Sequence, residues 1–230
     1  MTKIYCDIAD INLIRKFNKK DLVKGFTTNP SLMRKAGAKD YEKYSKQILK
    51  VTKKPVSCEV FADNTKQMIL QGHKISKWGK NVYVKVPVTN SKGQFMGRVI
   101  NQLNKEKIKL NVTAVYTSSQ AKKILKIINK KTKLIISFFA GRMADVGKDP
   151  IPQIRESIKL ARRYKNVEIL WASTREPYNF IQAKQLKCHI ITTPPAIIEK
   201  IEKFGKSYQK LTTDTVKGFL KDSKKSSFKI

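Results

Sequence analysis

The feature of this sequence that most constrains its fold is a repeated alternation of short apolar segments with longer segments of helical periodicity. Eight strand-sized apolar segments follow one another in this way, with no linker and no change in composition between them. Short apolar strands alternating with helices predict a parallel β-sheet. The predicted strands cover residues 2–7, 23–27, 55–61, 82–85, 109–114, 134–139, 167–172 and 189–192.

Eight strand–helix repeats within 230 residues predict a closed (β/α)8 barrel, or TIM barrel, because closure removes the exposed edges of the sheet. We expect a single domain over residues 1–230, with an extra C-terminal helix at about 207–222 and a basic tail. A doubly wound open sheet is the alternative. It is expected to carry a glycine-rich phosphate loop after its first strand, whereas residues 7–10 here contain no glycine.

The chain is strongly basic. With 49 lysines and arginines against 17 aspartates and glutamates, its formal net charge is +32. Such an excess can bind nucleic acid or an anionic membrane. Because the lysines are spread along the whole sequence, we expect a solvated basic surface with no dedicated nucleic-acid partner. A nucleic-acid-binding barrel without enzymatic activity is the alternative.

Three further features of the sequence bear on membrane association, cellular location and metal binding. The apolar runs are no longer than a strand, so we expect no membrane partner. The N-terminal residues include an aspartate where a signal peptide needs an apolar stretch, which favours a cytoplasmic protein. Cys6, Cys58 and Cys188 are far apart and lack metal-ligand spacing, so we expect small buried side chains and no metal site. Neither His73 nor His189 is expected to be catalytic.

Polar residues mark the ends of nearly all the predicted strands. In a (β/α)8 barrel the carboxyl ends of all strands meet at one face, where active sites are found. Burying so many polar groups for stability alone would be costly. The sequence therefore predicts an active site at this face. The residues concerned are Asp7, Thr27, Asn29, Glu59, Lys85, Asn111, Thr113, Ser137 and Ser173.

Lys85 is the candidate nucleophile. It lies in the apolar, β-branched run Val82–Thr89, where it must lose much of its hydration. Burial favours the neutral amine, which is the form that attacks a carbonyl to give a Schiff base. The alternatives are a lysine that extends from the strand end into water and a structural ion pair with Glu59. With Asp7 and Glu59 as acid/base groups, the catalytic interpretation is favoured.

Two arginines follow the sixth and seventh predicted strands. Arg142 and Arg175 come just after the strand ends, and Ser173 precedes Arg175 by two residues. Guanidinium groups pair well with phosphate oxygens, and this side of a barrel often holds a phosphate. These three residues together predict a sugar-phosphate substrate.

Five motifs connect the sequence to a known family: YCD at 5–7, TTNPSL at 27–32, VKVPVT at 84–89, NVTAVY at 111–116 and ASTR at 172–175. Through them the chain resembles the transaldolases over essentially its whole length, and most closely their short subfamily, which also contains the fructose-6-phosphate aldolases. The resemblance implies a (β/α)8 enzyme that forms a Schiff base and uses no metal and no organic cofactor.

Two positions discriminate within that family. At positions 59 and 139 this chain has Glu and Phe, and in this it resembles the transaldolase branch of the family. The aldolase branch has Gln and Tyr at these two positions. The segment 137–142, SFFAGR, is similar to the transaldolase pattern SPFVGR, with Phe138 in place of the proline. We therefore expect a transaldolase. A fructose-6-phosphate aldolase that releases free dihydroxyacetone is the alternative.

The resemblance also implies the reaction and the role of each residue. A transaldolase moves a dihydroxyacetone unit from sedoheptulose 7-phosphate or fructose 6-phosphate to an aldose phosphate, in the non-oxidative pentose phosphate pathway. Lys85 would form the Schiff base, Glu59 and Thr113 would hold a water that moves protons, and Asp7 would deprotonate the C4 hydroxyl. The remaining residues would bind substrate hydroxyls or line the mouth (Asn29, Asn111, Ser137, Thr27, Phe139) and bind phosphate (Arg142, Ser173, Arg175).

The C-terminal helix and the tail through Phe228 and Ile230 also resemble the short subfamily. There such a helix packs on a neighbouring subunit, which implies a homo-oligomer that is pentamer-based or decameric. A helix that covers its own barrel is the alternative.

Overall fold

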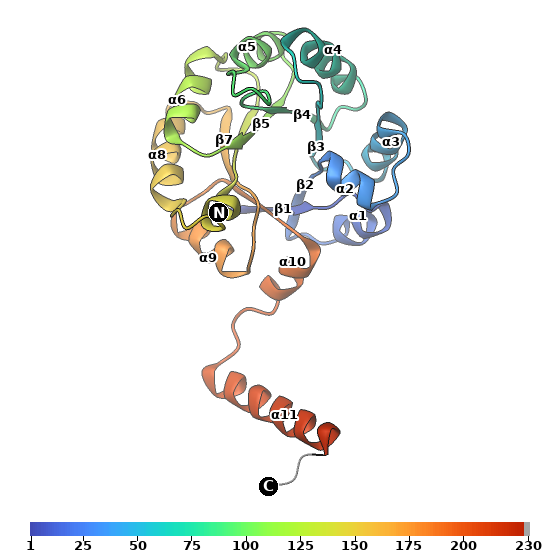
Figure 1. The fold of residues 1–230 in the computed structure, drawn as a ribbon, viewed down its shortest axis with the longest axis vertical. Helices are drawn as coiled ribbons and strands as arrows, with labels where there is room; N and C mark the ends of the chain where they lie inside the picture. The colour runs from blue at the N-terminus through green and yellow to red at the C-terminus, as the bar shows by residue number, and fades with distance from the viewer. Residues whose placement is uncertain (228–230) are drawn as a thin grey trace.

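The computed structural model describes residues 1–227 and places eight parallel strands in a closed barrel, paired in chain order, with β8 closing on β1 (Figure 1). The predicted (β/α)8 barrel is confirmed. The strands are β1 (Lys3–Asp7), β2 (Val23–Thr27), β3 (Val56–Glu59), β4 (Val82–Pro87), β5 (Leu110–Val115), β6 (Leu134–Phe138), β7 (Val167–Trp171) and β8 (Ile190–Thr193).

A ring of helices surrounds the barrel. Several of them begin at a side chain that accepts a hydrogen bond from the first turn, as Asp10, Asp40 and Asn64 do. The helices of the barrel are α1 (Ile11–Asn18), α2 (Pro30–Lys35), α3 (Tyr41–Val51), α4 (Thr65–Ser76), α5 (Gly97–Lys105), α6 (Ser118–Ile127), α7 (Ala140–Ala144), α8 (Ile151–Ala161), α9 (Tyr178–Gln185) and α10 (Pro195–Ile201).

The side chains inside the barrel form an apolar layer with a polar layer above it. Tyr5, Tyr83 and Leu170 belong to a buried cluster that is separate from the large core between strands and helices. Because side chains on one face of a strand recur every second residue, the next inward positions on β1 and β4 are Asp7 and Lys85. The apolar layer thus forms the floor on which the polar residues at the strand ends rest.

The main differences from the predicted elements are two strand ends and two short helices. The strand β4 continues past Lys85 to Pro87, and β3 ends two residues before the predicted position 61, where the Phe61 N–H turns to donate to Gln71 Oε1. The short helices α2 and α7 were not predicted. Asn29 starts α2 by accepting a hydrogen bond from the Leu32 N–H (2.9 Å).

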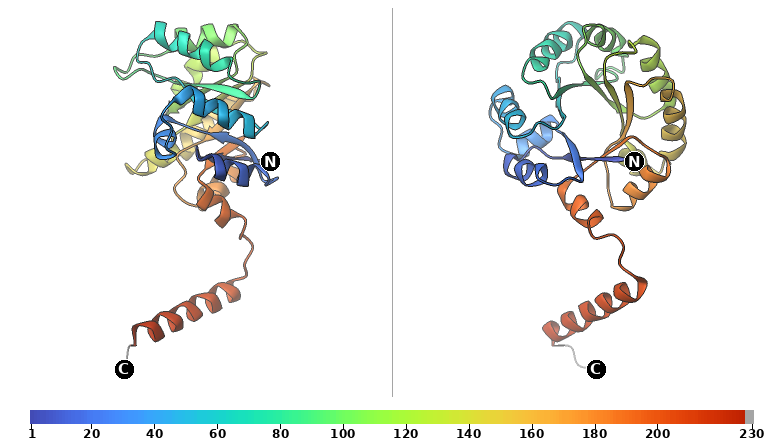
Figure 2. Two further views of the ribbon diagram at one scale, coloured as in Figure 1. Left: turned by 90° about the vertical axis from the view of Figure 1, so that its right-hand side faces the viewer. Right: turned by 180° about the vertical axis from the view of Figure 1, so that it is seen from behind.

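The extra C-terminal helix, α11 (Tyr208–Ser226), confirms the predicted helix and extends beyond 222. It lies away from the barrel at the end of an extended connection (Figures 1 and 2). None of its residues is buried, and Tyr208 is 89% and Phe219 69% exposed. The expectation for Phe228 and Ile230 lies outside the described residues. Within residues 1–227, no helix is both long enough and apolar enough to cross a membrane.

Candidate active site

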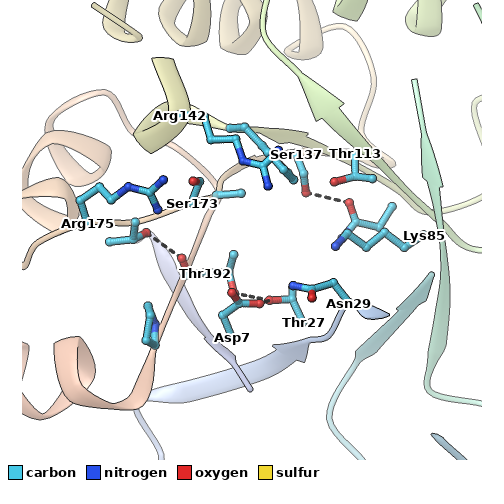
Figure 3. Close-up of a pocket in the computed structure, with 15 residues that line it drawn as sticks. Asp7, Thr27, Asn29, Lys85, Thr113, Ser137, Arg142, Ser173, Arg175 and Thr192 are labelled. Carbon is cyan, nitrogen blue, oxygen red and sulfur yellow. Dashed lines mark hydrogen bonds between the residues drawn. The ribbon is translucent and has the colours of Figure 1, made fainter. Parts of the chain in front are cut away.

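A cavity of about 220 Å³ opens at the carboxyl ends of the strands (Figure 3). Twelve residues were predicted from the sequence to form the site. Eleven of them line this cavity, and the twelfth, Glu59, contacts Lys85, which lines it. The cavity therefore gathers side chains from six strands and from the segment that follows β7, at one end of the barrel. The eleven are Asp7, Thr27, Asn29, Lys85, Asn111, Thr113, Ser137, Phe139, Arg142, Ser173 and Arg175.

Lys85 is buried, with 6% of its surface exposed. Its Nζ lies 3.1 Å from Glu59 Oε2 and donates a hydrogen bond to the backbone carbonyl of Thr28 (3.1 Å). The register of β3 on β4 pairs Glu59 with Lys85, so both side chains leave the sheet on the same side. The ammonium group does not extend into bulk water, which contradicts the exposed-lysine alternative.

Tyr41, on α3, fixes the backbone of Glu59. Its hydroxyl accepts from the Glu59 N–H (2.7 Å) and donates to the Glu59 carbonyl (3.0 Å). Its ring contacts Phe61 and Trp78 edge-on. Burial raises the pKa of the Tyr41 phenol, so the hydroxyl keeps its proton and can serve as donor and acceptor together. Tyr41 was not singled out from the sequence, since a tyrosine in a helix most often only packs.

Asp7 accepts a hydrogen bond from Thr27 Oγ1 (2.6 Å), and Thr27 Oγ1 lies 2.5 Å from Thr192 Oγ1. Because the Thr27 proton points at the carboxylate, Thr192 must donate to Thr27. Burial raises the pKa of Asp7, and the hydrogen bond from Thr27 and the positive charge of Lys85 offset this only in part. A buried carboxyl with a raised pKa is suited to exchange a proton with a substrate near neutral pH.

A second hydrogen-bonded chain lies beside Lys85. Ser137 Oγ donates to Asn111 Oδ1 (2.7 Å), and Asn111 Nδ2 donates to Ser57 Oγ (3.0 Å), with all three residues buried. Asn111 is the register neighbour of Lys85 on β5. The hydroxyl of Thr113 is buried with no hydrogen-bond partner among the described residues, so it is available to a ligand in the cavity.

The two arginines lie at the outer rim. The Arg142 guanidinium sits over the Phe139 ring (5.1 Å) and has no carboxylate partner in residues 1–227. Arg175 is held on both its Nε and Nη2 by the carboxylate of Asp145 (3.0 and 2.5 Å). The Arg175 pairing lowers the pKa of Asp145, so that carboxyl stays ionised. Arg142 lies in the short helix α7, which the sequence did not predict, and Asp145 follows that helix.

Close backbone contact joins the two arginine-bearing segments. A Cβ on Gly141 would lie 1.7 Å from the Ser173 carbonyl oxygen, so only glycine fits there. Ser173 has a φ of 63°, in the left-handed region that side chains other than glycine rarely adopt. Strained backbone of this kind concentrates at functional sites. Together, these features bring Arg142 and Arg175 to one rim.

The three cysteines and two histidines, which were not expected to be catalytic, do not line the cavity. All three cysteines are buried, and burial raises the pKa of the Cys58 thiol to about 12, so its thiolate is disfavoured. His73 pairs with Glu106, and His189 accepts from the Ile169 N–H; neither lines the cavity. Within the described residues, no three His, Cys, Asp or Glu side chains group as metal ligands.

Comparison with known proteins gives the family. The model of the Transaldolase/Fructose-6-phosphate aldolase family matches residues 4–230. The chain belongs to this family. It is 32% identical to a probable transaldolase of Thermoanaerobacter sp. (strain X514), over 99% of this chain and all of that protein. A probable transaldolase of Methanococcus vannielii is 33% identical, over 86% of this chain and 89% of that one. These relatives belong to the short transaldolase-like subfamily.

Solved structures add support for the fold alone. A putative phosphonomutase from Burkholderia cenocepacia J2315 superposes with a TM-score of 0.59 at 10% identity, covering 96% of this chain and 94% of that one. A putative dihydrodipicolinate synthase family protein from Coccidioides immitis gives 0.61 at 11% identity, over 82% and 65%. At these identities only the barrel is shared.

The burial of Asp7 predicts how the free energy of unfolding depends on this carboxyl and on pH. The pKa of Asp7 is higher in the folded than in the unfolded chain, so its stabilising contribution is present below the unfolded value of ~3.9 and is lost as pH rises through the folded value. Asp7→Asn removes this penalty and should raise the free energy of unfolding at pH 7 by more than the ~0.5 kcal/mol typical of neutral surface changes.

Urea denaturation checks this prediction. The gain in Asp7→Asn should shrink as the pH is lowered from 7 towards 4, whereas the exposed control Asp222→Asn should change little at either pH. A variant less stable than the parent at pH 7 would contradict the raised pKa.

Proposed function

We propose that the protein is a transaldolase, which transfers a dihydroxyacetone unit through a Schiff base from a ketose phosphate to an aldose phosphate, as in the non-oxidative pentose phosphate pathway. The supporting observation is the buried amine of Lys85, 3.1 Å from the Glu59 carboxylate, at the floor of a polar cavity. The relatives named probable transaldolase make the same chemistry the first choice for this chain.

Glu59 provides the proton transfers that Schiff-base formation needs. Lys85 must lose a proton before it attacks the ketone carbon, and the Glu59 carboxylate is the adjacent acceptor. The attack gives a carbinolamine, and loss of water from it gives an iminium. The free hydroxyl of Thr113 supports the role of binding that water together with Glu59. The Thr28 carbonyl keeps the Lys85 amine directed into the cavity.

Asp7 then breaks the carbon–carbon bond. Its carboxylate accepts the proton of the C4 hydroxyl, the C3–C4 bonding electrons move into the iminium, and an aldose phosphate leaves. The three-carbon unit stays on Lys85 as an enamine. An acceptor aldose phosphate reverses these steps, and water finally releases Lys85. The Thr192–Thr27 chain supports this role because it orients the Asp7 carboxylate.

The remaining residues bind the sugar. We assign Asn29, Asn111 and Ser137 to the hydroxyls of the three-carbon unit, because the hydrogen bonds of Asn111 and Ser137 fix their orientation beside Lys85. Arg142, Ser173 and Arg175 are assigned to the phosphate. In Figure 3, Arg175 faces the cavity from the side opposite Lys85, as the extended shape of a sugar phosphate requires.

Trapping the Schiff base tests the nucleophile. Borohydride reduction in the presence of fructose 6-phosphate should leave a three-carbon adduct on the peptide that carries Lys85, identified by mass mapping. Lys85→Met should lose the adduct and at least about a thousandfold of the transfer rate. The control is Lys54→Met, because Lys54 is also a partly buried lysine, hydrogen-bonded to the Asn18 carbonyl, and should keep both properties. An adduct on another lysine would overturn the assignment.

Phe139 is the residue that we expect to favour transfer of the three-carbon unit over its release as free dihydroxyacetone. Its ring lines the cavity and contacts the Tyr116 ring, and it offers no hydroxyl that could direct a water onto the enamine. Phe139→Tyr should raise release of free dihydroxyacetone relative to transfer onto erythrose 4-phosphate by about tenfold, or ~1.4 kcal/mol. The exposed control Phe61→Tyr should leave the ratio unchanged. Dominant release by the parent would favour the fructose-6-phosphate aldolase alternative.

We also propose that α11 packs on a neighbouring subunit of a pentamer-based or decameric homo-oligomer. Within residues 1–227, the helix exposes Leu211, Val216, Phe219 and Leu220, and no apolar surface of the described chain covers them. Phe219→Asp with Leu220→Asp should reduce the mass measured by light scattering, whereas Lys217→Asp on the same helix should not. A parent that scatters as a monomer would contradict the proposal.

A further inference from the structure

A second cavity lies at the end of the barrel opposite Lys85. We call it the basic hollow; its volume is about 660 Å³. It is formed where β1 and β8 begin and by the turns that lead into β6 and β7, so it lies at the amino ends of parallel strands whose carboxyl ends form the site above. The hollow is lined by Lys3, Lys130, Lys131, Lys133, Ala161, Arg162, Tyr164, Lys165, Asn166, Val167, Glu168 and His189.

Positive charge is concentrated in the basic hollow. Six of its twelve lining residues are Lys or Arg, against 49 of 230 in the whole chain. Glu168 is the one lining carboxylate among the described residues, and it is already paired with Lys3 at 2.5 Å. Within residues 1–227 the other five cations have no carboxylate partner. Like charges that line one hollow repel one another, so a polyanion would relieve the repulsion.

The turn that carries three of these lysines is held in place by two partly buried asparagines. Asn129 Oδ1 accepts from the backbone N–H groups of Lys131 and Thr132 (2.8 and 2.7 Å). Asn166, at the start of β7, donates to the carbonyls of Asn129 and Thr132 (3.0 and 2.6 Å). This network ties the turn of Lys130–Lys133 to the segment that carries Lys165. The cations are therefore presented on a fixed backbone, which lowers the entropic cost of binding.

Two ring side chains complete the lining. His189 Nδ1 accepts from the Ile169 N–H (3.1 Å), so the neutral ring carries its proton on Nε2 and presents an N–H donor there. The ring of Tyr164 is covered by the Lys130 ammonium at 5.9 Å. Single-stranded nucleic acid is usually held by stacking bases on open aromatic faces. Because Tyr164 is the one Phe, Tyr or Trp in the lining and the Lys130 ammonium already lies over its ring, the basic hollow favours a compact phosphate ligand over a nucleic-acid strand.

The charge of the hollow sets the ligand class. Its lining has a formal excess of five positive charges, whereas one phosphate group brings at most about two negative charges near pH 7. We propose that the basic hollow binds an oligophosphate, a chain of three or more linked phosphate groups such as inorganic tripolyphosphate or the triphosphate of a nucleotide. This site is separate from the cavity of Lys85, and its assignment does not depend on the transaldolase proposal.

Titration calorimetry with sodium tripolyphosphate tests the site on the full chain. The parent should bind it, more weakly as salt rises, and should bind orthophosphate at least about tenfold less tightly. Lys131→Ala with Lys165→Ala should weaken tripolyphosphate binding by at least about tenfold. The control, Lys122→Ala with Lys123→Ala on α6, removes equal charge outside the hollow and should stay within about twofold. Replacing tripolyphosphate by ATP separates the two sources, because tighter ATP binding would indicate contacts beyond the phosphates.

Three results would overturn the proposal. Equal weakening in both double variants would mean diffuse attraction to a basic surface. Displacement of tripolyphosphate by saturating fructose 6-phosphate would place the ligand at the Lys85 cavity. Tighter binding of a single-stranded oligonucleotide, lost with the same two lysines, would make the hollow a nucleic-acid site. Both double variants should melt no lower than the parent in low salt, which shows that lost binding is not lost folding.

Discussion

The interaction on which the site depends is the contact between Lys85 and Glu59 at the mouth of the barrel. Removing two charges from water is expensive, and a buried pair seldom adds net stability. This pair is nevertheless surrounded by satisfied polar groups: the Thr28 carbonyl on the amine, and Tyr41 on the backbone of Glu59. Such an arrangement stabilises a particular geometry more than it stabilises the fold. It keeps an amine and a proton acceptor 3.1 Å apart in a largely buried position.

The barrel makes that geometry possible through its layers. Tyr5 and Tyr83 fill the interior below, and two residues further along the same strands the chain presents Asp7 and Lys85. Because side chains on one face of a strand recur every second residue, Asp7 must lie on the same face of β1 as Tyr5, and Lys85 on the same face of β4 as Tyr83. The floor therefore fixes the height at which the reactive groups stand. In an open sheet, the ends of β1 and β8 would not meet, and Thr192 could not reach Thr27.

The sequence could predict the barrel, its eight strands and most residues of the cavity, because short apolar runs that alternate with helical segments, and polar strand ends, are local signals. It could not predict Tyr41, Thr192 or Asp145. Each acts by contacting a residue far along the chain, as Asp145 contacts Arg175 thirty positions away. It also missed α7, a helix of five residues whose glycine is explained by the carbonyl of Ser173 in another segment. Local pattern cannot reveal a contact of that kind.

The two ends of the barrel treat positive charge differently, and the difference bears on what each can bind. At the mouth, Arg175 has a carboxylate partner in Asp145 and Arg142 has none in the described chain, so one guanidinium is held in place while the other has no carboxylate competing with a ligand. Lys85 is balanced by Glu59. At the amino end, three lysines on a turn braced by Asn129 and Asn166, together with Arg162 and Lys165, have no carboxylate partner within residues 1–227. A balanced site can select one phosphate monoester by geometry, whereas an unbalanced one selects by total charge and binds best the ligand with the most phosphates.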